Sequence, residues 1–523
     1  MAGTMEALRE EIAQAKKDNA YDKGSFVPND LLNKLFTEDV KEQINLICPE
    51  IAVDGLTKVI ATLVYNEKLT ADVLKSLHDA GFTDQYLPIK LSQKKDVFKS
   101  ARENRIFKPF LVGADSMAFE RDQWLFCSPS FGSAKHEELD PRCPIPIVHC
   151  SKKSLRGSFG EVFEVQMHHA HLRVKPQPVS PIWVSKIPNA DFLETEENNP
   201  VLAMKKMISD SDQEYDQERE ALQRIQRLQH PHLIEMIASF RRGRDHFFLF
   251  PWANGGDLRD WWERNSNLER TPAMVRWVLE QMKGIASAVK ELHFPSERTV
   301  EDENGRHGDL KPGNIVVFND QPGENPRRTL CITDAGLARF HENITSKRMT
   351  GTNTNGGSIE YGPPDPRRED KKVKISRLYD MWSLGCVFLE FIVWVLGGWT
   401  EVESFRARRK SKRRDGEFYQ KTITGYYRVL PEVKRCMNSI LSDKRCQGDN
   451  CFRDVVNIIR NHLLRIGEKH RTTSQVLERL FLSILEKANG SPSYLCGPNA
   501  GAGFRPGPIP EYSVIGNVAR LLI

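Results

Sequence analysis

The segment that most limits how this chain can fold is a run of 19 mostly apolar residues, "MWSLGCVFLEFIVWVLGGW", at positions 381–399. A helix of that length and composition nearly suffices to span the hydrocarbon core of a membrane. Glu390 lies inside the run, however, and Asp380 directly precedes it. A helix that is apolar on all sides is also what the centre of a large domain requires. We therefore predict a buried core helix and no membrane span.

The bulk properties are those of an ordinary globular protein. A length of 523 residues predicts two or three domains. The formal charge of +5 is small for this length and gives no clear nucleic-acid role. The N-terminal segment is charged and amphipathic, so we expect no secretory signal. The ten cysteines form no Cys-x-x-Cys pair, which favours reduced thiols in a cytoplasmic protein, with the nucleus as the alternative compartment.

The N-terminal region, residues 1–140, shows mainly helical patterns. Met5, Leu8 and Ile12 fall on one helix face, and Thr70 is placed to cap a later helix. The region carries no catalytic pattern. We therefore expect a helical accessory region that docks a partner protein or regulates the rest of the chain.

The pattern changes near residue 145. Short β-like runs, "GEVFEVQM", "PIWVSKI" and "HFFLFPW", surround one charged helix, "DQEREALQRIQRLQ". Beyond residue 256 the chain is again helical, apart from two strands in "NIVVF" and "TLCITDAG". This order predicts an α+β fold, with a small β-rich lobe at about 145–254 and a larger helical lobe at about 255–485. The segment 490–523 begins rich in Gly and Pro, and we expect a disordered tail.

The segment "RHGDLKPGNIVVF", residues 306–318, places acidic and basic groups at fixed offsets before an apolar strand. It resembles the catalytic loop of the eukaryotic protein kinases, a resemblance that extends over about residues 150–485. The resemblance implies a bilobal kinase fold, with Asp309 accepting or orienting the substrate hydroxyl proton. It also implies that Lys311 contacts the transferring phosphate and that Asn314 binds one Mg²⁺. The matching residues are His307, Asp309, Lys311 and Asn314.

Further segments resemble other parts of the kinase family. "ITDAGLARF" resembles the metal-binding segment, with Asp334 as a Mg²⁺ ligand beside Asn314. An Asn and an Asp suffice because Mg²⁺ keeps water and phosphate ligands. Asp380 resembles the residue that braces the backbone of the catalytic loop. "GSIEYGPPD" resembles the end of the activation segment, where Asp365 is expected to pair with Arg471.

The nucleotide site is expected between two strands. "GSFGEVFEV" places bare glycine backbone where phosphates can approach closely. "VSKI" puts Lys186 on a later strand, from which the resemblance implies contact with the α- and β-phosphates. "FPWANGGDL" resembles the hinge that holds the adenine. The nucleotide-binding residues that the resemblance implies are Gly157, Ser158, Phe159, Gly160, Val162, Lys186, Phe250, Trp252 and Ala253.

The lysine also needs an acidic partner from the charged helix. Glu214, Glu218 and Glu220 are the candidates. We prefer Glu218, because Leu222 and Ile225 follow at i+4 and i+7 and place it on the buried face. The stretch "FLETEENNPVLAMKK" lies between this helix and Lys186, and we interpret it as an inserted loop.

Three positions depart from the family pattern. Leu155 stands where the first glycine is usual, Ala335 replaces a phenylalanine, and Gly308 replaces an arginine that receives an activation-loop phosphate. None of these changes removes a residue that contacts metal, phosphate or nucleophile. We therefore favour an active kinase that uses Mg-ATP. A nucleotide-binding pseudokinase that acts as a signalling scaffold remains the alternative.

Two residues favour Ser and Thr of protein substrates as the acceptors. Lys311 follows Asp309 by two positions, as in Ser/Thr-specific members of the family. Ser358 stands three residues before Tyr361, where such members usually carry a threonine. The chain is therefore expected to be a protein serine/threonine kinase.

Two remaining segments are less specific. "SFRARRKSKRRDGEF", residues 404–418, is either a nuclear-localisation or anionic-surface patch, or a solvated insertion after the core helix. We favour the insertion. In the N-terminal region, "RDQWLFCSPSF" resembles accessory segments of filamentous-fungal kinases, which implies no function by itself.

Overall fold

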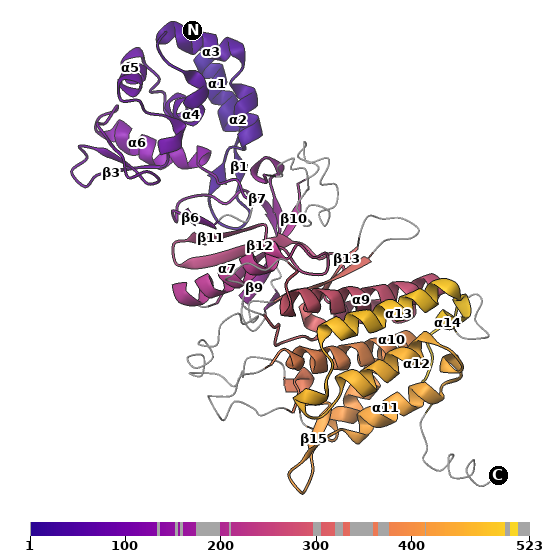
Figure 1. Cartoon of the computed structure of the whole chain (residues 1–523). Helices are drawn as coiled ribbons and strands as arrows, with labels where there is room; N and C mark the ends of the chain where they lie inside the picture. The colour runs from indigo at the N-terminus through magenta and orange to yellow at the C-terminus, as the bar shows by residue number, and fades with distance from the viewer. Residues whose placement is uncertain are drawn as a thin grey trace, which may run out of the picture. The chain divides into compact units, whose positions relative to one another are not determined.

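The chain forms two compact units. The computed structural model describes residues 2–132, 136–151, 155–156, 160–173, 199–208, 211–296, 305–319, 328–334, 359–364, 376–413, 415–496 and 503–510. The first unit combines Met1–Tyr215 with Met236–Trp252, and the second combines Asp216–Glu235 with Ala253–Ile523. The N-terminal region and the β-rich lobe thus share one unit (Figure 1). The sequence had placed a boundary between them near residue 140.

The N-terminal region is helical, as predicted, with added short strands. Its helices are α1 (Ala2–Ala15), α2 (Asn29–Leu35), α3 (Glu38–Ile47), α4 (Thr57–Tyr65), α5 (Ala71–Asp79) and α6 (Ala114–Asp122). Its strands are β1 (Lys17–Asp18), β2 (Ser25–Phe26), β3 (Ile89–Leu91), β4 (Phe98–Ser100) and β5 (Ile106–Phe107). Leu8 and Ile12 are buried on one face of α1. Thr70 caps α5, because its hydroxyl accepts the Val73 N–H at 3.3 Å.

A seven-stranded sheet dominates the rest of the first unit, in the order β6-β11-β12-β10-β9-β7, with β8 paired to β9. Its strands are β6 (His136–Leu139), β7 (Ile147–Cys150), β8 (Leu155–Arg156), β9 (Gly160–Met167), β10 (Val201–Met207), β11 (Ala238–Arg242) and β12 (Asp245–Pro251). β6 runs parallel to β11, and the other pairs are antiparallel. The interpretation of residues 201–206 as part of an inserted loop is wrong, since β10 lies at the centre of the sheet. The expected strand "PIWVSKI" lies outside the described residues.

The N-terminal region covers one face of this sheet. The Tyr21 ring packs edge-on against Phe163 and Phe247, with centroid distances of 5.6 and 5.9 Å. Phe131 packs against Phe240 at 5.1 Å. Alternate residues of the strands complete this core on the same face, namely Val165, Leu202, Met204 and Leu249. Part of the hydrophobic core of the β-rich lobe is therefore supplied by residues before position 140.

The second unit is helical. Its helices are α8 (Leu258–Arg264), α9 (Pro272–His293), α10 (Leu378–Lys410), α11 (Pro431–Ser442), α12 (Cys451–Ile458), α13 (Ser474–Gly490) and α14 (Pro492–Cys496). Most of α7 (Asp212–Arg227) also belongs to it. Two antiparallel pairs are present, β13 (Ile315–Asn319) with β14 (Arg328–Ile332), and β15 (Tyr419–Lys421) with β16 (Tyr427–Val429). Figure 1 shows α9 and α13 side by side.

Helix α10 is the central element of this unit, and the predicted core helix is confirmed. It is long and apolar enough to cross a membrane by length and composition alone, but its apolar segment is almost entirely buried within the protein. The helix bends at Gly398, whose φ of 71° belongs to the left-handed region that favours glycine.

A buried charge cluster joins the two segments of α10 on either side of the bend at Gly398. Glu390 is fully buried, and its carboxylate accepts hydrogen bonds from Arg406 and Arg409, each at 2.9 Å, and from the Tyr361 hydroxyl at 2.8 Å. Burial raises the pKa of Glu390, but the two arginines outweigh burial and lower the pKa to about 2. The charge cluster therefore holds an ionised carboxylate inside the domain.

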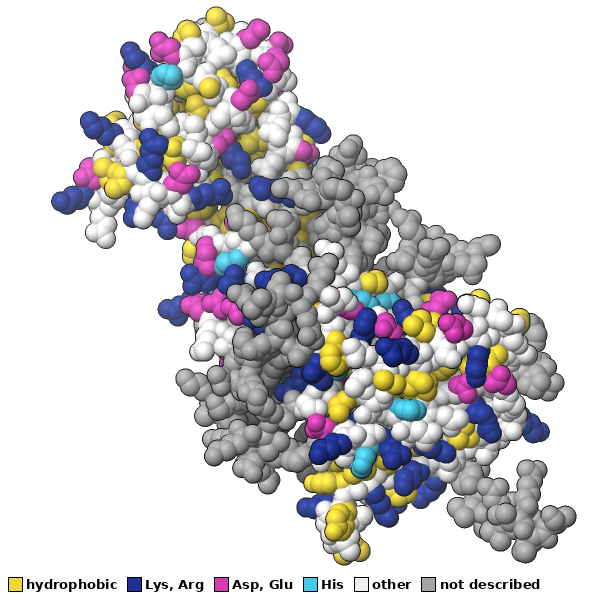
Figure 2. Space-filling view, in the orientation of Figure 1, with side chains coloured by type: hydrophobic (Ala, Val, Ile, Leu, Met, Phe, Trp, Pro, Cys, Tyr) yellow, Lys and Arg dark blue, Asp and Glu magenta, His cyan; other side chains and the backbone are white. Residues whose placement is uncertain are grey.

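The same cluster corrects the interpretation of the basic run. The run starts within the last turns of α10 and is not a solvated insertion, because Arg406 and Arg409 are buried. Its exposed members are Arg408, Lys410 and Lys412. Figure 2 shows Lys and Arg side chains around the β15–β16 hairpin on the same unit. A continuous exposed patch of seven basic residues is therefore not formed.

The expected disordered tail is also corrected for its described part. Helix α14 buries Tyr494 and Leu495. Phe504 exchanges two backbone hydrogen bonds with Arg270, at 2.8 and 3.1 Å. Residues 503–510 therefore pack against the helical unit.

The segment after α7 is held by two histidines. His232 Nδ1 donates to the Leu330 carbonyl at 2.7 Å, and its ring lies so close to α9 that only glycine fits at position 284. His230 Nδ1 accepts the His232 N–H at 3.2 Å, and its Nε2 donates to Ser287 Oγ at 3.1 Å. Burial, with a contribution from His232, lowers the pKa of His230 to about 4.

We predict that replacing Glu390 with Gln lowers the free energy of unfolding by roughly 3–5 kcal/mol, because two buried guanidinium groups lose their counter-charge. Urea denaturation followed by tryptophan fluorescence measures the change. The matched control is Glu403→Gln, an exposed residue on the same helix, with an expected change within about 0.5 kcal/mol. Equal effects of the two substitutions would contradict the structural role of Glu390.

The lowered pKa of His230 predicts a pH dependence. The unfolded chain binds a proton at His230 below about pH 6.5, whereas the folded chain stays neutral there until about pH 4. Stability is therefore lost as the pH falls through this window, by up to about 1.4 kcal/mol per pH unit. We expect the stability of His230→Asn to fall less steeply with decreasing pH than that of wild type, as measured by melting curves recorded between pH 7 and 4. His470→Asn, at an exposed site, should retain the wild-type slope.

Candidate active site

The catalytic-loop residues converge on one carboxylate. His307 and Asp309 are buried, as is Asn314, which directly precedes β13. Asp309 Oδ2 accepts hydrogen bonds from Lys311 Nζ at 2.9 Å and from Asn314 Nδ2 at 3.0 Å. The bond from the charged Lys311 is a strong one, and the two bonds together hold the carboxylate in place. The structure thus brings together Asp309, Lys311 and Asn314, as the resemblance to the kinase catalytic loop implies.

The backbone of this loop is held by Asp380, as predicted. Its two carboxylate oxygens accept the N–H groups of His307 and Gly308, each at 2.8 Å. His293 Nε2 donates to the same carboxylate at 2.8 Å. Burial raises the pKa of Asp380, but the hydrogen bond from His293 and the other donors outweigh burial and hold the pKa below its ordinary value. Asp380 is therefore an ionised, fully enclosed anchor for the loop.

Gly308 adopts a backbone conformation that few other residues tolerate. Its φ is 79°, in the left-handed region. A Cβ atom at this position would meet only Arg306 Nε, at 3.9 Å, so space is not what favours glycine. The backbone conformation gives a local structural reason for glycine where the family usually has arginine.

The end of β14 lies against the catalytic loop. The Thr333 N–H donates to the Asn314 carbonyl at 2.9 Å, and His307 Nε2 donates to the Thr333 carbonyl at 3.0 Å. Asp334 follows directly and has a φ of 55°, which is unfavourable for a non-glycine residue. Backbone strain of this kind concentrates at functional sites. Asp334 is thus placed beside Asn314 in a strained conformation.

The donor atoms of this pair fit Mg²⁺. Asn314 Nδ2 donates to both the carbonyl and the carboxylate of Asp309, at 2.8 and 3.0 Å. Its Oδ1 is consequently the amide atom that is left to bind a cation. Together with the Asp334 carboxylate it supplies hard oxygen ligands, which Mg²⁺ prefers.

In the first unit, a lysine lies beside the glycine-rich segment. Lys205, on β10, is 8% exposed and lies opposite Val162 of β9. A Cβ atom at Gly160 would lie 3.1 Å from both Cγ and Cε of Lys205, so the lysine stem runs along this glycine. The aliphatic stem is buried against the backbone next to the segment expected to hold phosphates.

Phe250 shares a sheet face with that lysine. It lies opposite Ala203, two residues before Lys205 on β10. Residues two apart on a strand, and residues directly opposite in neighbouring strands, have side chains on the same face. Val162, Lys205 and Phe250 therefore lie on the face opposite the core formed with the N-terminal region. Trp252 and Ala253, which follow β12, are half-buried.

The charged helix α7 buries the expected acid. Glu218 is 6% exposed and lies on the same helix face as the buried Leu222 and Ile225. Glu220 is exposed and Glu214 is half-buried. The structure thus agrees with the preference for Glu218 as the buried glutamate of this helix.

Comparison with known families and proteins decides the fold. Residues 192–446 match the family model of the protein kinase domain. The fold is the bilobal protein kinase fold. The match begins after Lys186 and includes Lys205, Glu218 and Asp380, together with the catalytic loop. It supports a eukaryotic-type protein kinase and does not test the fungal resemblance of the N-terminal region.

The curated relatives are kinases of low identity. The serine/threonine-protein kinase RAD53 of Saccharomyces cerevisiae is 25% identical over 176 residues, 32% of this chain and 19% of that protein. The serine/threonine-protein kinase TOUSLED of Arabidopsis thaliana is 28% identical over 167 residues, 32% of this chain and 22% of that protein. The L-type lectin-domain containing receptor kinase V.5 of the same plant is 23% identical over 232 residues, 41% of this chain and 32% of that protein. The chain spans about a fifth to a third of these relatives.

Several residues predicted for the kinase site lie outside the described residues. They are Gly157, Ser158, Phe159, Lys186, Ala335, Ser358 and Asp365. Lys205 was not among the residues expected at the site, because "VSKI" comes first along the chain and resembles the lysine-bearing strand of the family. "VLAMKKM" is a second lysine-bearing run, with Lys205 and Lys206 near its end, and it lies just before the charged helix.

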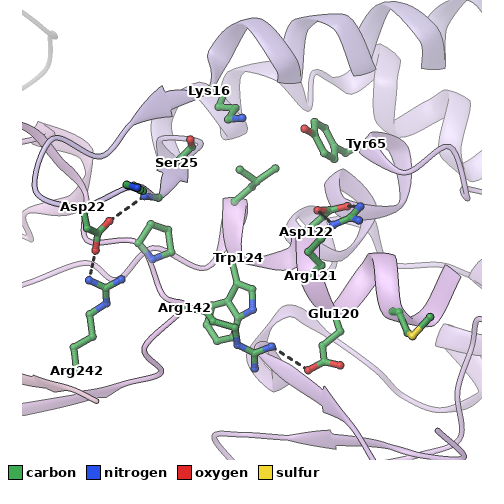
Figure 3. Close-up of a pocket in the computed structure, with 15 residues that line it drawn as sticks. Lys16, Asp22, Ser25, Tyr65, Glu120, Arg121, Asp122, Trp124, Arg142 and Arg242 are labelled. Carbon is green, nitrogen blue, oxygen red and sulfur yellow. Dashed lines mark hydrogen bonds and ion pairs between the residues drawn. The ribbon is translucent and has the colours of Figure 1, made fainter. Parts of the chain in front are cut away.

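A cavity in the first unit lies away from these residues. It has a volume of about 670 Å³ and is lined by residues of the first unit, most of them from the N-terminal region. Figure 3 shows Trp124 among the lining side chains, Arg142 paired with Glu120, and Arg242 paired with Asp22. No catalytic-loop residue lines it. The cavity is therefore no part of the candidate site for phosphoryl transfer.

We predict that Asp380→Asn loosens the catalytic loop. The amide replaces charge-assisted hydrogen bonds that each contribute about 1.5–3 kcal/mol. Hydrogen exchange of peptides that contain His307 and Gly308 should accelerate by on the order of tenfold to a hundredfold. Asp449→Asn, at a side chain that is 76% exposed, serves as the control and should leave this exchange unchanged. Unaltered exchange in Asp380→Asn would rule out the anchoring role.

Proposed function

We propose that this protein is a serine/threonine kinase that transfers the γ-phosphate of Mg-ATP to Ser or Thr hydroxyls of protein substrates. The observation that carries the proposal is the buried Asp309 carboxylate, bound by Lys311 and Asn314 on a loop that Asp380 anchors. Two relatives are named serine/threonine-protein kinases, which supports this acceptor class.

The residues divide the chemistry among them. Asp309 is positioned to accept a hydrogen bond from the acceptor hydroxyl and so to orient it toward the phosphate. Lys311 places a positive charge 2.9 Å from that carboxylate, near developing negative charge. Asn314 and Asp334 would hold Mg²⁺, which neutralises phosphate charge when bound. Catalysis here relies on positioning and electrostatic stabilisation without a covalent intermediate.

We further propose that Lys205, and not Lys186, contacts the nucleotide phosphates. Its stem lies along Gly160, and it shares a face with Val162 and Phe250. The match to the kinase family also begins beyond Lys186. The role of Glu218 as the acidic partner of this lysine stays a prediction.

The biological setting is inferred from sequence alone. A cytoplasmic location, with the nucleus as alternative, stays a prediction, as does a partner protein bound through the N-terminal helices. A pseudokinase scaffold is the competing function. It differs from an active kinase in phosphate transfer and not in nucleotide binding.

The first test compares wild type with Asp309→Asn, each with Mg-ATP and a generic basic protein substrate. Phosphosites are mapped by mass spectrometry. We expect phosphoserine or phosphothreonine from wild type and a rate lower by about 10²- to 10⁴-fold for Asp309→Asn, since the hydroxyl-orienting carboxylate is lost. Asp449→Asn should react at the wild-type rate. Nucleotide binding without transfer by folded wild type would favour the pseudokinase.

The second test identifies the lysine. Lys205→Met should lower transfer by about 10²- to 10³-fold, as expected when one charged stabiliser of the phosphates is lost. The matched control is Lys206→Met on the same strand, because Lys206 is half-buried and bonds to Asp245 at 2.8 Å. Lys186→Met should retain activity. Loss in Lys186→Met with full activity in Lys205→Met would restore the original assignment.

A further inference from the structure

Three side chains that bind metals in other proteins meet in the first unit, away from the kinase residues. Asp30 lies in the first turn of α2, and His168 and His169 directly follow β9. Their potential ligand atoms all lie within 4.8 Å of one another. His168 and His169 are buried, and Asp30 is half-buried. We propose that Asp30, His168 and His169 form a zinc site that links helix α2 to the end of β9.

The spacing of one pair matches two ligands of one metal ion. His169 Nε2 lies 3.4 Å from Asp30 Oδ2. Zinc–ligand bonds of about 2.0–2.2 Å in a tetrahedron place neighbouring ligand atoms about 3.3–3.6 Å apart. A direct charge-assisted hydrogen bond would bring them to about 2.7–2.9 Å. The observed distance fits a bridging metal better than a direct ion pair.

Asn199 orients the His169 ring for metal binding. Its Oδ1 accepts the His169 backbone N–H at 2.8 Å and lies 3.3 Å from His169 Nδ1. Since this oxygen can only accept, Nδ1 carries the ring proton and Nε2 presents its lone pair toward Asp30. Metal-bound histidines usually donate their other N–H to an oxygen in this way.

Asp30 has a free acceptor atom inside the protein. Its buried Oδ1 has no hydrogen-bond partner within the part of the chain that the structure describes. The ammonium group of Lys34, a largely exposed side chain, lies 4.0 Å from the other oxygen. A buried carboxylate oxygen without a donor is costly, and a bound cation would offset that cost.

The neighbouring His171 is excluded as a ligand. Its Nδ1 donates to the Pro129 carbonyl at 2.8 Å, and its Nε2 accepts the Asn29 N–H at 3.3 Å. Both ring nitrogens are therefore engaged. The hydrogen bond from the Ala170 N–H to His168 Nδ1 is long, at 3.4 Å.

The ligand types favour zinc. Two imidazoles and one carboxylate form a borderline-soft set that binds Zn²⁺ with a fourth position for water, whereas Mg²⁺ and Ca²⁺ prefer oxygen ligands. The ion would join α2 to the end of the strand that begins at Gly160. This proposal goes beyond kinase activity and does not depend on it.

The test uses the full chain after chelator treatment, titrated with Zn²⁺ or with Co²⁺ as a spectroscopic substitute. We expect one equivalent bound per chain, visible ligand-field bands of four-coordinate Co²⁺, and a higher melting temperature with zinc. His169→Ala and Asp30→Asn should abolish the one-equivalent binding. Asn199→Ala should weaken it by about 10- to 100-fold. His78→Ala, at an exposed histidine of the same unit, should bind like wild type.

Circular dichroism of the metal-free variants separates loss of binding from loss of folding. If His169→Ala unfolds, the proposal is tested instead by the metal affinity of Asn199→Ala, which is expected to be weaker than that of wild type. Absence of stoichiometric Zn²⁺ and Co²⁺ binding by folded wild type would overturn the proposal. Wild-type affinity in both Asp30→Asn and His169→Ala would overturn it as well, because the metal would then bind elsewhere.

Discussion

The candidate catalytic loop depends on one buried carboxylate. Asp380 has no exposed surface, so its charge is tolerated only because His307, Gly308 and His293 donate hydrogen bonds to it. Asp380 also lies in the first turn of α10, the most buried helix of the second unit. The hydrophobic core thus fixes the helix, the helix fixes the carboxylate, and the carboxylate fixes the loop that carries Asp309. Catalytic geometry is therefore a consequence of core packing.

Charges buried in this protein serve to hold segments in place. Glu390 joins the two halves of α10, and the buried Arg270 guanidinium donates to the Val395 and Trp394 carbonyls of the same helix. Each is compensated by several hydrogen bonds, which is the condition for retaining a charge in a protein interior. Such enclosed groups specify one arrangement of segments, because an alternative packing would leave them without partners.

Local sequence patterns predicted the elements whose signals are confined to one segment. Examples are the Thr70 cap, the buried helix α10 and the face of Glu218, whereas the role of Asp380 followed from the resemblance to the kinase family. The sequence did not predict that β10 occupies the centre of the sheet, since two similar lysine-bearing runs, at Lys186 and Lys205, compete within a short stretch. Pairing between distant strands depends on contacts that no local pattern records. The same limit explains why the burial of Arg406 was not anticipated within a run of basic residues.

The contact of Tyr21 with Phe163 and Phe247 has a consequence for how this chain can be inherited. In many multidomain proteins a catalytic domain can be exchanged, because its core is closed without its neighbours. Here the β-rich lobe shares its core with residues before position 140. A gene fusion that transferred only the kinase-matching residues would leave an apolar sheet face uncovered. The N-terminal region and the kinase lobe are therefore expected to pass between genes, and to diverge, as a single piece.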